Sequence, residues 1–406
     1  MSTAREGASA HARYHLVART CVVIAVLLFL ACREKPTQPQ ATVGHFTAVF
    51  AGDYSTCAID RTGGLYCWGR NDSGQLGIGT SLETCADSAI AGYGASTCAL
   101  AAAAVRGGLD VTSVSRAGLG TCALANAGKA YCWGAGWIVP GDTSSTVPVV
   151  VPAPQGFASI TGGFEHVCTV GTNGVAYCWG TGYTMRADTP QVISGGLNFR
   201  SVTAGAYHTC GLTVDSKAYC WGLQTSGDLG TGDGALSDSM PVRVSGALTF
   251  ASVNSFAYHT CGLTAGGAAY CWGDDSFNQL ATVNATAGCG MAGGSCSPTP
   301  VPSAAGMTFV AISPGGWHTC ALASGGVAYC WGRGREGQLG NGSFSDSPTP
   351  VRAAAPLTFQ AISAGWQHTC GIAMDGRSYC WGENAFGQLG DGTITSRATA
   401  ILIAGQ

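Results

Sequence analysis

The sequence predicts an all-β protein, a seven-bladed β-propeller with four-stranded blades and a disulfide within one hairpin of each blade. First, a sequence unit recurs seven times, each copy carrying two cysteines with nine residues between them and Trp-Gly after the second. Second, successive units are spaced 42 to 65 residues apart, close to the period of four-stranded blades. Third, only 10% of the residues are charged and 62 of 406 are glycine. This composition favours short strands joined by tight turns, with sheets that cover one another's faces.

Residues 1–31 are predicted to be a signal peptide. Basic residues precede an eleven-residue apolar segment, 21–31. Because a membrane-spanning helix needs about 20 apolar residues, this segment is too short for a permanent anchor. Ala31 followed by Cys32 resembles a bacterial lipobox, which implies lipid attachment at Cys32. Lipoboxes usually have Leu where this chain has Phe29, so a cleaved secretory peptide with a soluble product is the alternative. Either way the mature chain is exported, to the cell envelope or the medium.

The cysteine spacing has a direct geometric meaning. Folding one unit about Gly325 sets Cys320 opposite Cys330 and Leu322 opposite Ala328 in an antiparallel hairpin. Directly opposed residues have Cα atoms about 4.5–5.5 Å apart, within the disulfide range of about 4.4–6.8 Å. Each such bridge is expected to stabilise the fold by about 3 kcal/mol. The predicted hairpin disulfides are Cys57–Cys67, Cys122–Cys132, Cys168–Cys178, Cys210–Cys220, Cys261–Cys271, Cys320–Cys330 and Cys370–Cys380.

Zinc binding is the competing interpretation of paired cysteines. Structural zinc sites favour two to four residues between ligands, so a spacing of nine does not fit, and export also favours disulfides. Four further cysteines lie in insertions of units one and five, 82–110 and 282–305. Each insertion is expected to be closed by its own disulfide, Cys85–Cys98 and Cys289–Cys296. Crossed pairing between the two insertions stays open.

The best-preserved unit runs through Gly315 to Leu322, Gly326 to Gly332, Gly337 to Gly340 and Pro348 to Arg352. Its pattern, G-x-x-H-T-C-A-L…G-x-x-Y-C-W-G…G-Q-L-G…P-x-x-V, resembles the regulator of chromosome condensation repeat. That resemblance implies a seven-bladed propeller. Cytoplasmic members usually carry unlinked residues where this chain has cysteines, so the resemblance is to a bacterial, exported, cysteine-rich variant.

The domain organisation follows from these features. Residues 32–44 form a polar linker, and 45–406 form the propeller. The Gly-Gln-Leu-Gly element is absent from units two and three, whose connections are expected to be remodelled. The strands near 45–50 and 398–404 are expected to be neighbours where the ring closes.

Histidines raise a metal hypothesis. Five units have histidine two residues before their first cysteine, and imidazole binds zinc, copper and nickel. Seven-fold geometry spreads such residues around a ring, whereas a single ion needs ligands within about 2 Å. We therefore expect a repeated structural role and no metal or cofactor. The five are His166, His208, His259, His318 and His368.

Two further groups were considered for binding or catalysis. Aromatic residues stand one or two places before repeat histidines, and they would form a contact surface if exposed at the rim. Packing is the preferred interpretation for them, as it is for the seven Trp-Gly tryptophans. Loop carboxylates show no calcium-loop or catalytic motif, so no enzymatic activity is expected. The residues concerned are Trp137, Tyr207, Tyr258, Trp317, Trp366, Asp233, Asp238, Asp274 and Asp275.

The resulting functional hypothesis is an exported, lipid-anchored propeller that binds an extracytoplasmic protein or surface polymer. A rigid scaffold with variable loops supports it, and the insertions 82–110 and 282–305 are the first expected contact surfaces. A net charge of −3 argues against nucleic acid. We expect a monomer that meets the membrane only through its lipid. The alternatives are an extracellular enzyme inhibitor and a polysaccharide-active enzyme, while nucleotide exchange on a cytoplasmic GTPase is excluded by export.

Overall fold

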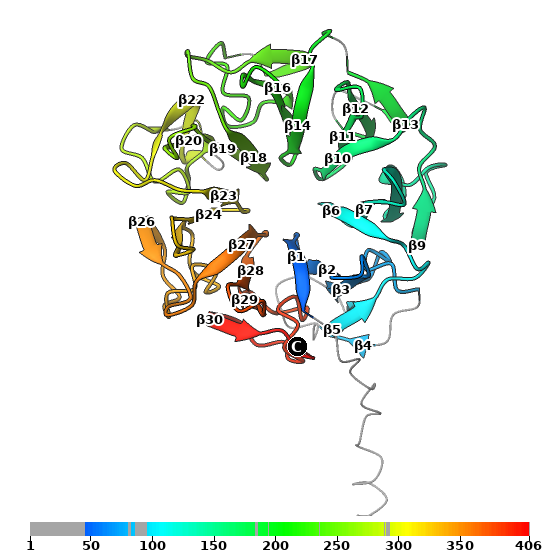
Figure 1. The fold of residues 1–406 in the computed structure, drawn as a ribbon. Helices are drawn as coiled ribbons and strands as arrows, with labels where there is room; N and C mark the ends of the chain where they lie inside the picture. Colours follow the sequence, from blue (N-terminus) through cyan, green and yellow to red (C-terminus); the bar gives the residue numbers. More distant parts are fainter. Residues whose placement is uncertain are drawn as a thin grey trace, which may run out of the picture. The chain divides into compact units, whose positions relative to one another are not determined.

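The fold is a ring of seven antiparallel sheets around a central axis (Figure 1), as the sequence predicts. The computed structural model describes residues 45–79, 83–85, 96–182, 186–193, 195–234, 236–287, 289 and 293–405. Each sheet consists of consecutive strands of the chain, so each blade is one sequence unit. The first strand of each blade lies at the axis and the later strands lie progressively outward.

The strand bounds follow the seven units closely. The strands of blades one to three are β1 (Phe46–Ala51), β2 (Ser55–Asp60), β3 (Leu65–Arg70), β4 (Glu83–Thr84), β5 (Thr97–Ala104), β6 (Val111–Ala117), β7 (Gly120–Ala125), β8 (Lys129–Gly134), β9 (Ser145–Val150), β10 (Phe157–Gly162), β11 (His166–Gly171), β12 (Ala176–Gly180) and β13 (Ala187–Val192). Those of blades four and five are β14 (Phe199–Ala204), β15 (His208–Thr213), β16 (Ala218–Leu223), β17 (Ser237–Arg243), β18 (Ser252–Phe256), β19 (His259–Leu263), β20 (Ala269–Asp274), β21 (Thr286–Ala287) and β22 (Ser295–Ser303). Those of blades six and seven are β23 (Ala311–Pro314), β24 (His318–Leu322), β25 (Ala328–Gly332), β26 (Ser347–Arg352), β27 (Phe359–Ala364), β28 (His368–Ala373), β29 (Ser378–Gly382) and β30 (Arg397–Leu402).

Blades one and five differ from the expected four strands, because each has a two-residue fifth strand at its outer edge. These are β4 and β21, and both belong to the long insertions. The insertions are also shorter than expected. Residues 97–104 of the first insertion and 295–303 of the second are β5 and β22, the regular fourth strands of their blades.

The hairpin registers match the predictions. Cys320 pairs with Cys330 and Leu322 with Ala328, and the corresponding cysteines are paired in every blade. Because strand side chains alternate, the cysteines face one neighbouring blade while Trp331 faces the other. Cys320 and Cys330 pack against Trp381 of the next blade, and Trp331 packs against the cysteines of the preceding blade. This contact recurs around the ring and forms the core between blades.

The ring closes by packing between complete blades. β30 pairs with β29 inside blade seven, while β1 pairs with β2 inside blade one. At the seam β1 lies against β27 and β28. Phe46 of β1 also shares a core cluster with Ile401 of β30, so the terminal segments are neighbours through side-chain packing and not through strand pairing. Trp68 donates a hydrogen bond to the Gln388 carbonyl across the seam at 2.9 Å. The seam thus has the same tryptophan-to-carbonyl bond as the boundary between blades six and seven.

Candidate binding face at the propeller axis

The cysteines fall into two geometric groups. In the seven hairpin pairs the sulfurs lie together at disulfide distance, with Cα atoms 4.0–4.1 Å apart. The loop pairs Cys85–Cys98 and Cys289–Cys296 are also placed together, with Cα separations of 5.9 and 5.4 Å. Cys98 lies in β5 and Cys296 in β22, so these contacts join each insertion to the fourth strand of its own blade. No crossed pair occurs among the described cysteines.

The repeat histidines bond to a side chain of the following blade. His318 Nε2, for example, lies 2.9 Å from the Thr369 hydroxyl, and His368 makes the same 2.9 Å contact with Thr56 across the seam. Burial lowers the pKa of these imidazoles to about 3 or 4, so they are neutral near pH 7. Among the described residues no three histidine, cysteine or acidic side chains gather as a metal site. The histidine role is therefore inter-blade bonding.

The predicted loop carboxylates stabilise loops or lie apart from one another. Asp274 accepts hydrogen bonds from Ser276 and from the Gln279 amide, both at 2.6 Å, and Asp275 accepts from the Leu280 backbone at 2.8 Å. Burial raises the pKa of Asp275 to about 6. In blade four, Asp238 lies in β17, where burial and then the charge of Asp233 raise its pKa.

Two kinds of loop emerge at the same end of every blade. Ser55, which begins β2, pairs with Gly69 near the end of β3, so the loop that precedes β2 and the loop that follows β3 lie side by side. The same register recurs in the other blades. We call this end of the propeller the axis face. The aromatic residues before the histidines belong to loops of this face, and so do the described parts of the insertions that precede β5 and β22.

The axis face carries a cluster of partly exposed aromatic rings. We define the aromatic cluster as Phe164, Tyr207, Tyr258, Trp317 and Trp366, one residue from each of blades three to seven. Trp366 is its centre, because its ring centroid lies 4.7 Å from that of Trp317, 5.3 Å from Phe164 and 6.2 Å from Tyr258. None of the five rings is fully buried. The cluster is thus a contact surface as well as a packing unit.

Sequence reasoning found four of these rings and missed Phe164. The available signal was position, since Phe164 stands two residues before its histidine, as Trp366 does. Trp137 is partly exposed and donates a hydrogen bond from its indole to the Phe164 carbonyl at 3.3 Å. It therefore supports the loop that presents Phe164.

Two arginines place their guanidinium groups over aromatic rings of the axis face. The guanidinium of Arg333 is 4.7 Å from the Trp317 ring centroid and 5.3 Å from that of Phe277. Arg70 is 5.6 Å from the ring of Tyr54 and 5.3 Å from that of Phe386. These contacts are cation–π interactions.

Several buried carboxyl groups lie in the loops of this face. Burial raises the pKa of Asp228 and of Glu383 to about 7 and that of Asp53 to about 6, although nearby arginines favour the ionised forms of Asp53 and Glu383. Asp228 Oδ1 is buried without a hydrogen-bond partner. Burial, followed by the charges of Tyr207, Asp228, Asp53 and Asp274, raises the pKa of Tyr258 to about 12. Above about pH 7, where these carboxyl groups are ionised, they add negative charge near the cluster.

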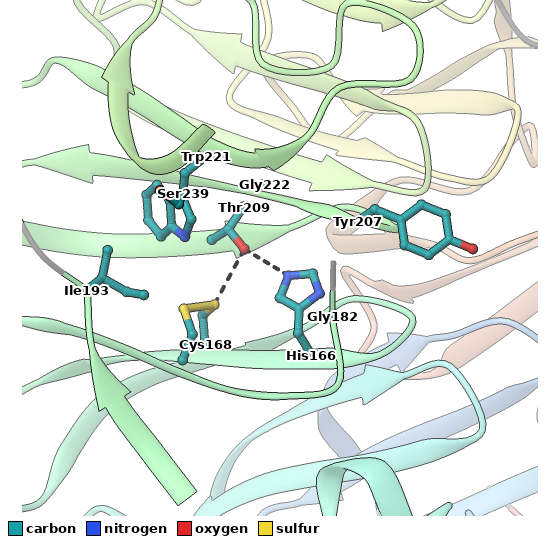
Figure 2. A pocket seen from close by; sticks show the side chains of 10 residues that line it. His166, Cys168, Gly182, Ile193, Tyr207, Thr209, Trp221, Gly222 and Ser239 are labelled. Carbon is teal, nitrogen blue, oxygen red and sulfur yellow. Dashed lines mark hydrogen bonds between the residues drawn. A yellow bond between two sulfur atoms is a disulfide. The ribbon is translucent and has the colours of Figure 1, made fainter. Parts of the chain in front are cut away.

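Two cavities lie near the histidine ring. The first has a volume of about 30 Å³ and lies between blades three and four. His166, Tyr207 and Thr209, which Figure 2 shows together, are among the residues that line it. Blade three lacks the Gly-Gln-Leu-Gly element whose leucine fills the corresponding space in blades six and seven. The second, of about 140 Å³, is on the axis and is lined by hydroxyl-bearing inner strands and Arg116. Neither is large enough for a typical organic ligand, which needs about 300 Å³ or more.

Several predicted features lie outside the described residues. These are the signal peptide, Cys32, the linker and parts of both insertions. Within the part of the chain that the structure describes, no helix is long and apolar enough to cross a membrane.

Fold and site together define a repeat-built propeller of the interaction-scaffold kind. Models of the regulator of chromosome condensation (RCC1) repeat match residues 46–75, 199–228, 257–279, 309–338, 325–372 and 359–388. The chain belongs to the RCC1 repeat family.

Known proteins agree with this assignment. The ultraviolet-B receptor UVR8 of Arabidopsis thaliana is 29% identical over 335 residues, which cover 77% of this chain and 71% of the receptor. The RCC1 domain-containing protein RUG3 of the same plant is 38% identical over 107 residues, 26% of this chain and 22% of that relative. The match thus spans about a fifth of RUG3.

Solved structures show the same fold. Human WBSCR16 superposes with a TM-score of 0.72 at 18% identity, covering 84% of this chain and 94% of that one. Prp20p from Saccharomyces cerevisiae, whose structure was described with its binding to Gsp1p and histones, gives 0.65 at 22% identity, covering 79% and 80%.

Proposed function

We propose that this chain is an exported, lipid-anchored binding module that holds an extracytoplasmic protein on its axis face. The observation that carries the proposal is the aromatic cluster, where five partly exposed rings from five blades converge. Tyr and Trp are enriched in protein interfaces because they bury a large apolar area and keep a polar group for bonding. The binding of Gsp1p and histones by the Prp20p propeller supports a protein partner.

Export is supported by the cysteines. Disulfides form and persist outside the cytoplasm, and the hairpin cysteines face each other at bonding distance in every blade. The apolar segment before Cys32 supplies the export signal in this proposal, and Cys32 carries the lipid. A fatty-acid label that enters the wild-type chain but not a Cys32→Ser variant would support the anchor, and equal labelling of both would contradict it.

Site-specific photo-crosslinking tests the binding face. A photoreactive amino acid replaces Tyr207 on the axis face or, as a control, Val214, which is 60% exposed and follows the opposite end of the same strand, β15. We expect one extracytoplasmic protein to crosslink from position 207 at several times the yield from position 214. Equal yields, or capture only from position 214, would contradict the proposed face.

A further inference from the structure

The aromatic rings of the cluster are partly exposed and so accessible to a partner. Trp366 contacts the rings of Phe164, Tyr258 and Trp317 at 4.7–6.2 Å between centroids, distances typical of tilted and edge-to-face pairs. Tyr207 joins the group through Phe164, at 5.6 Å. In such packing each ring shields part of its neighbour while some of its own face stays accessible. The accessible face of an aromatic ring is electron-rich and attracts cations.

The chain itself shows which group these rings accept. Arg333 stacks on Trp317 at one edge of the cluster, and Arg70 stacks on Tyr54 in blade one. Both arginines also contact acids, Arg70 with Asp72 at 2.6 Å and Arg333 with Glu336 at 3.6 Å. Within the described residues no arginine or lysine lies over Phe164, Tyr207, Tyr258 or Trp366. These four of the five rings therefore have no cation of the described chain against them.

Acidic groups act on two of these four rings, Tyr207 and Tyr258. The charge of Glu165, an exposed residue beside Phe164, acts on Tyr207. Those of Asp228, Asp53 and Asp274 act on Tyr258. Asp228 has a carboxylate oxygen buried without a hydrogen-bond partner, and an ionised carboxylate in that state is stabilised when a cation approaches. Rings and carboxylates thus favour the same kind of ligand.

We propose that Phe164, Tyr207, Tyr258 and Trp366 bind a guanidinium or ammonium group from a basic segment of the partner protein. The inference rests on the proposed function and adds the chemistry of its contact. An anionic polymer would be repelled by the surrounding carboxylates. A neutral sugar would gain binding free energy from contact with the rings but none from the negative charges. An arginine side chain gains from both, because its planar guanidinium stacks on the rings while its charge faces the acids.

The test compares two isosteric probes on the full exported chain. One is a tetra-arginine peptide and the other is tetra-citrulline, which has the same shape without the charge. We expect the arginine peptide to bind at least ten-fold more tightly in calorimetric titration, and its affinity to fall as salt is added. Trp366→Leu should weaken binding about ten-fold, whereas Phe344→Leu, which removes a 53%-exposed ring outside the cluster, should have no effect. Tyr207→Leu gives a second reading should Trp366→Leu fail to fold.

Other outcomes overturn the inference in distinguishable ways. Equal affinity for the two peptides, or preference for a neutral oligosaccharide, would show that charge is not recognised. If the arginine peptide fails while a partner still crosslinks from position 207, the chemistry is wrong but the binding face stands. If the arginine peptide does not bind and no partner crosslinks from position 207, both the inference and the proposed function are wrong. Binding that survives both Trp366→Leu and Tyr207→Leu would place the cation elsewhere.

Discussion

The boundary between blades six and seven contains a complete set of inter-blade bonds. His318 contacts the Thr369 hydroxyl at 2.9 Å, and that hydroxyl donates to the Gln338 carbonyl at 3.0 Å. The Trp381 indole donates to the same carbonyl at 2.9 Å. Each of these four side chains is fully buried, so their polar atoms depend on one another.

The boundary between blades two and three has lost that polar pair. Gly120 of blade two occupies the position that His318 has in blade six. Val167 of blade three occupies the position that Thr369 has in blade seven. Ile138, from the single-turn 3-10 helix η1 (Gly136–Ile138), fills the vacated space, since a side chain on Gly120 would meet Ile138 Cδ1. The Trp179 indole still donates to a carbonyl, here that of Ile138, at 3.2 Å.

The difference shows that the histidine and threonine of a boundary can be replaced together. The tryptophan-to-carbonyl bond survives in both, while the histidine and threonine disappear together. Replacing both partners of a buried hydrogen bond by apolar groups is nearly neutral, whereas removing one leaves a buried polar atom unpaired. The boundary between blades one and two gives a third solution. Ser55 replaces the histidine there, and Arg116 donates to the Thr121 hydroxyl and to the Gln75 carbonyl.

Among the predictions, the largest expected effect is that lowering the pH reduces the free energy of unfolding through the boundaries that contain histidine and not through those that lack it. The five buried histidines stay neutral down to about pH 3 or 4, whereas in the unfolded chain they protonate near pH 6.5. Below pH 6.5 the unfolded state therefore binds more protons, and each histidine lowers the free energy of unfolding by about 1.4 kcal/mol per pH unit. Asp53, Asp228, Asp275 and Glu383 act in the opposite direction between about pH 7 and 4, because their folded pKa values are raised.

Comparing variants isolates the histidine effect from these acids. The stability gap between wild type and His318→Leu should narrow by about 1.4 kcal/mol for each pH unit below 6.5, measured by calorimetry from pH 7 to 4. Val167→Thr, in the boundary without histidine, should keep a constant gap. A pH-independent gap for His318→Leu would contradict a buried, neutral His318.

A double-mutant cycle should reproduce the natural replacement in blades six and seven. Thr369→Val leaves the buried His318 Nε2 unpaired and should cost about 1–3 kcal/mol, and His318→Leu alone should also destabilise. The double variant should be less destabilised than the sum by about 1 kcal/mol, measured by denaturant unfolding with the disulfides intact. Strict additivity would show that the two side chains do not act as a pair.

The smallest effect is expected from restoring one polar residue to the apolar boundary. Val167→Thr buries a hydroxyl, but the Ile138 carbonyl that accepts from Trp179 also offers it a partner, as the Gln338 carbonyl does for Thr369. We therefore expect a loss of about 1 kcal/mol or less by the same unfolding measurement. A loss above about 2 kcal/mol would mean that this carbonyl does not accept the new hydroxyl.

The repeat made the hairpins predictable. A fixed nine-residue spacing and a two-residue strand period set Cys320 opposite Cys330 without any tertiary information. The extent of the insertions was misjudged for two reasons. β5 lacks the Pro-x-x-Val spacing of the standard unit, so its sequence reads as loop. β22 does contain that spacing, from Pro298 to Val301, but the preceding Gly-rich residues and the extra cysteines made the whole segment read as an insertion. The candidate site was only partly predictable. Trp317 and Trp366 were singled out, but their convergence with Phe164 depends on five loops meeting at the axis.

The sequence alone determined the local structure of this protein, because spacing and alternation act within one hairpin and recur in each unit. It determined the number of blades, the cysteine partners within each hairpin and the residues that face each neighbour. Tertiary structure decided which residues from different blades meet. His318 bonds Thr369, Ile138 fills the space over Gly120, and the aromatic rings gather at one end, because closing seven sheets into a ring places their loops around a single axis.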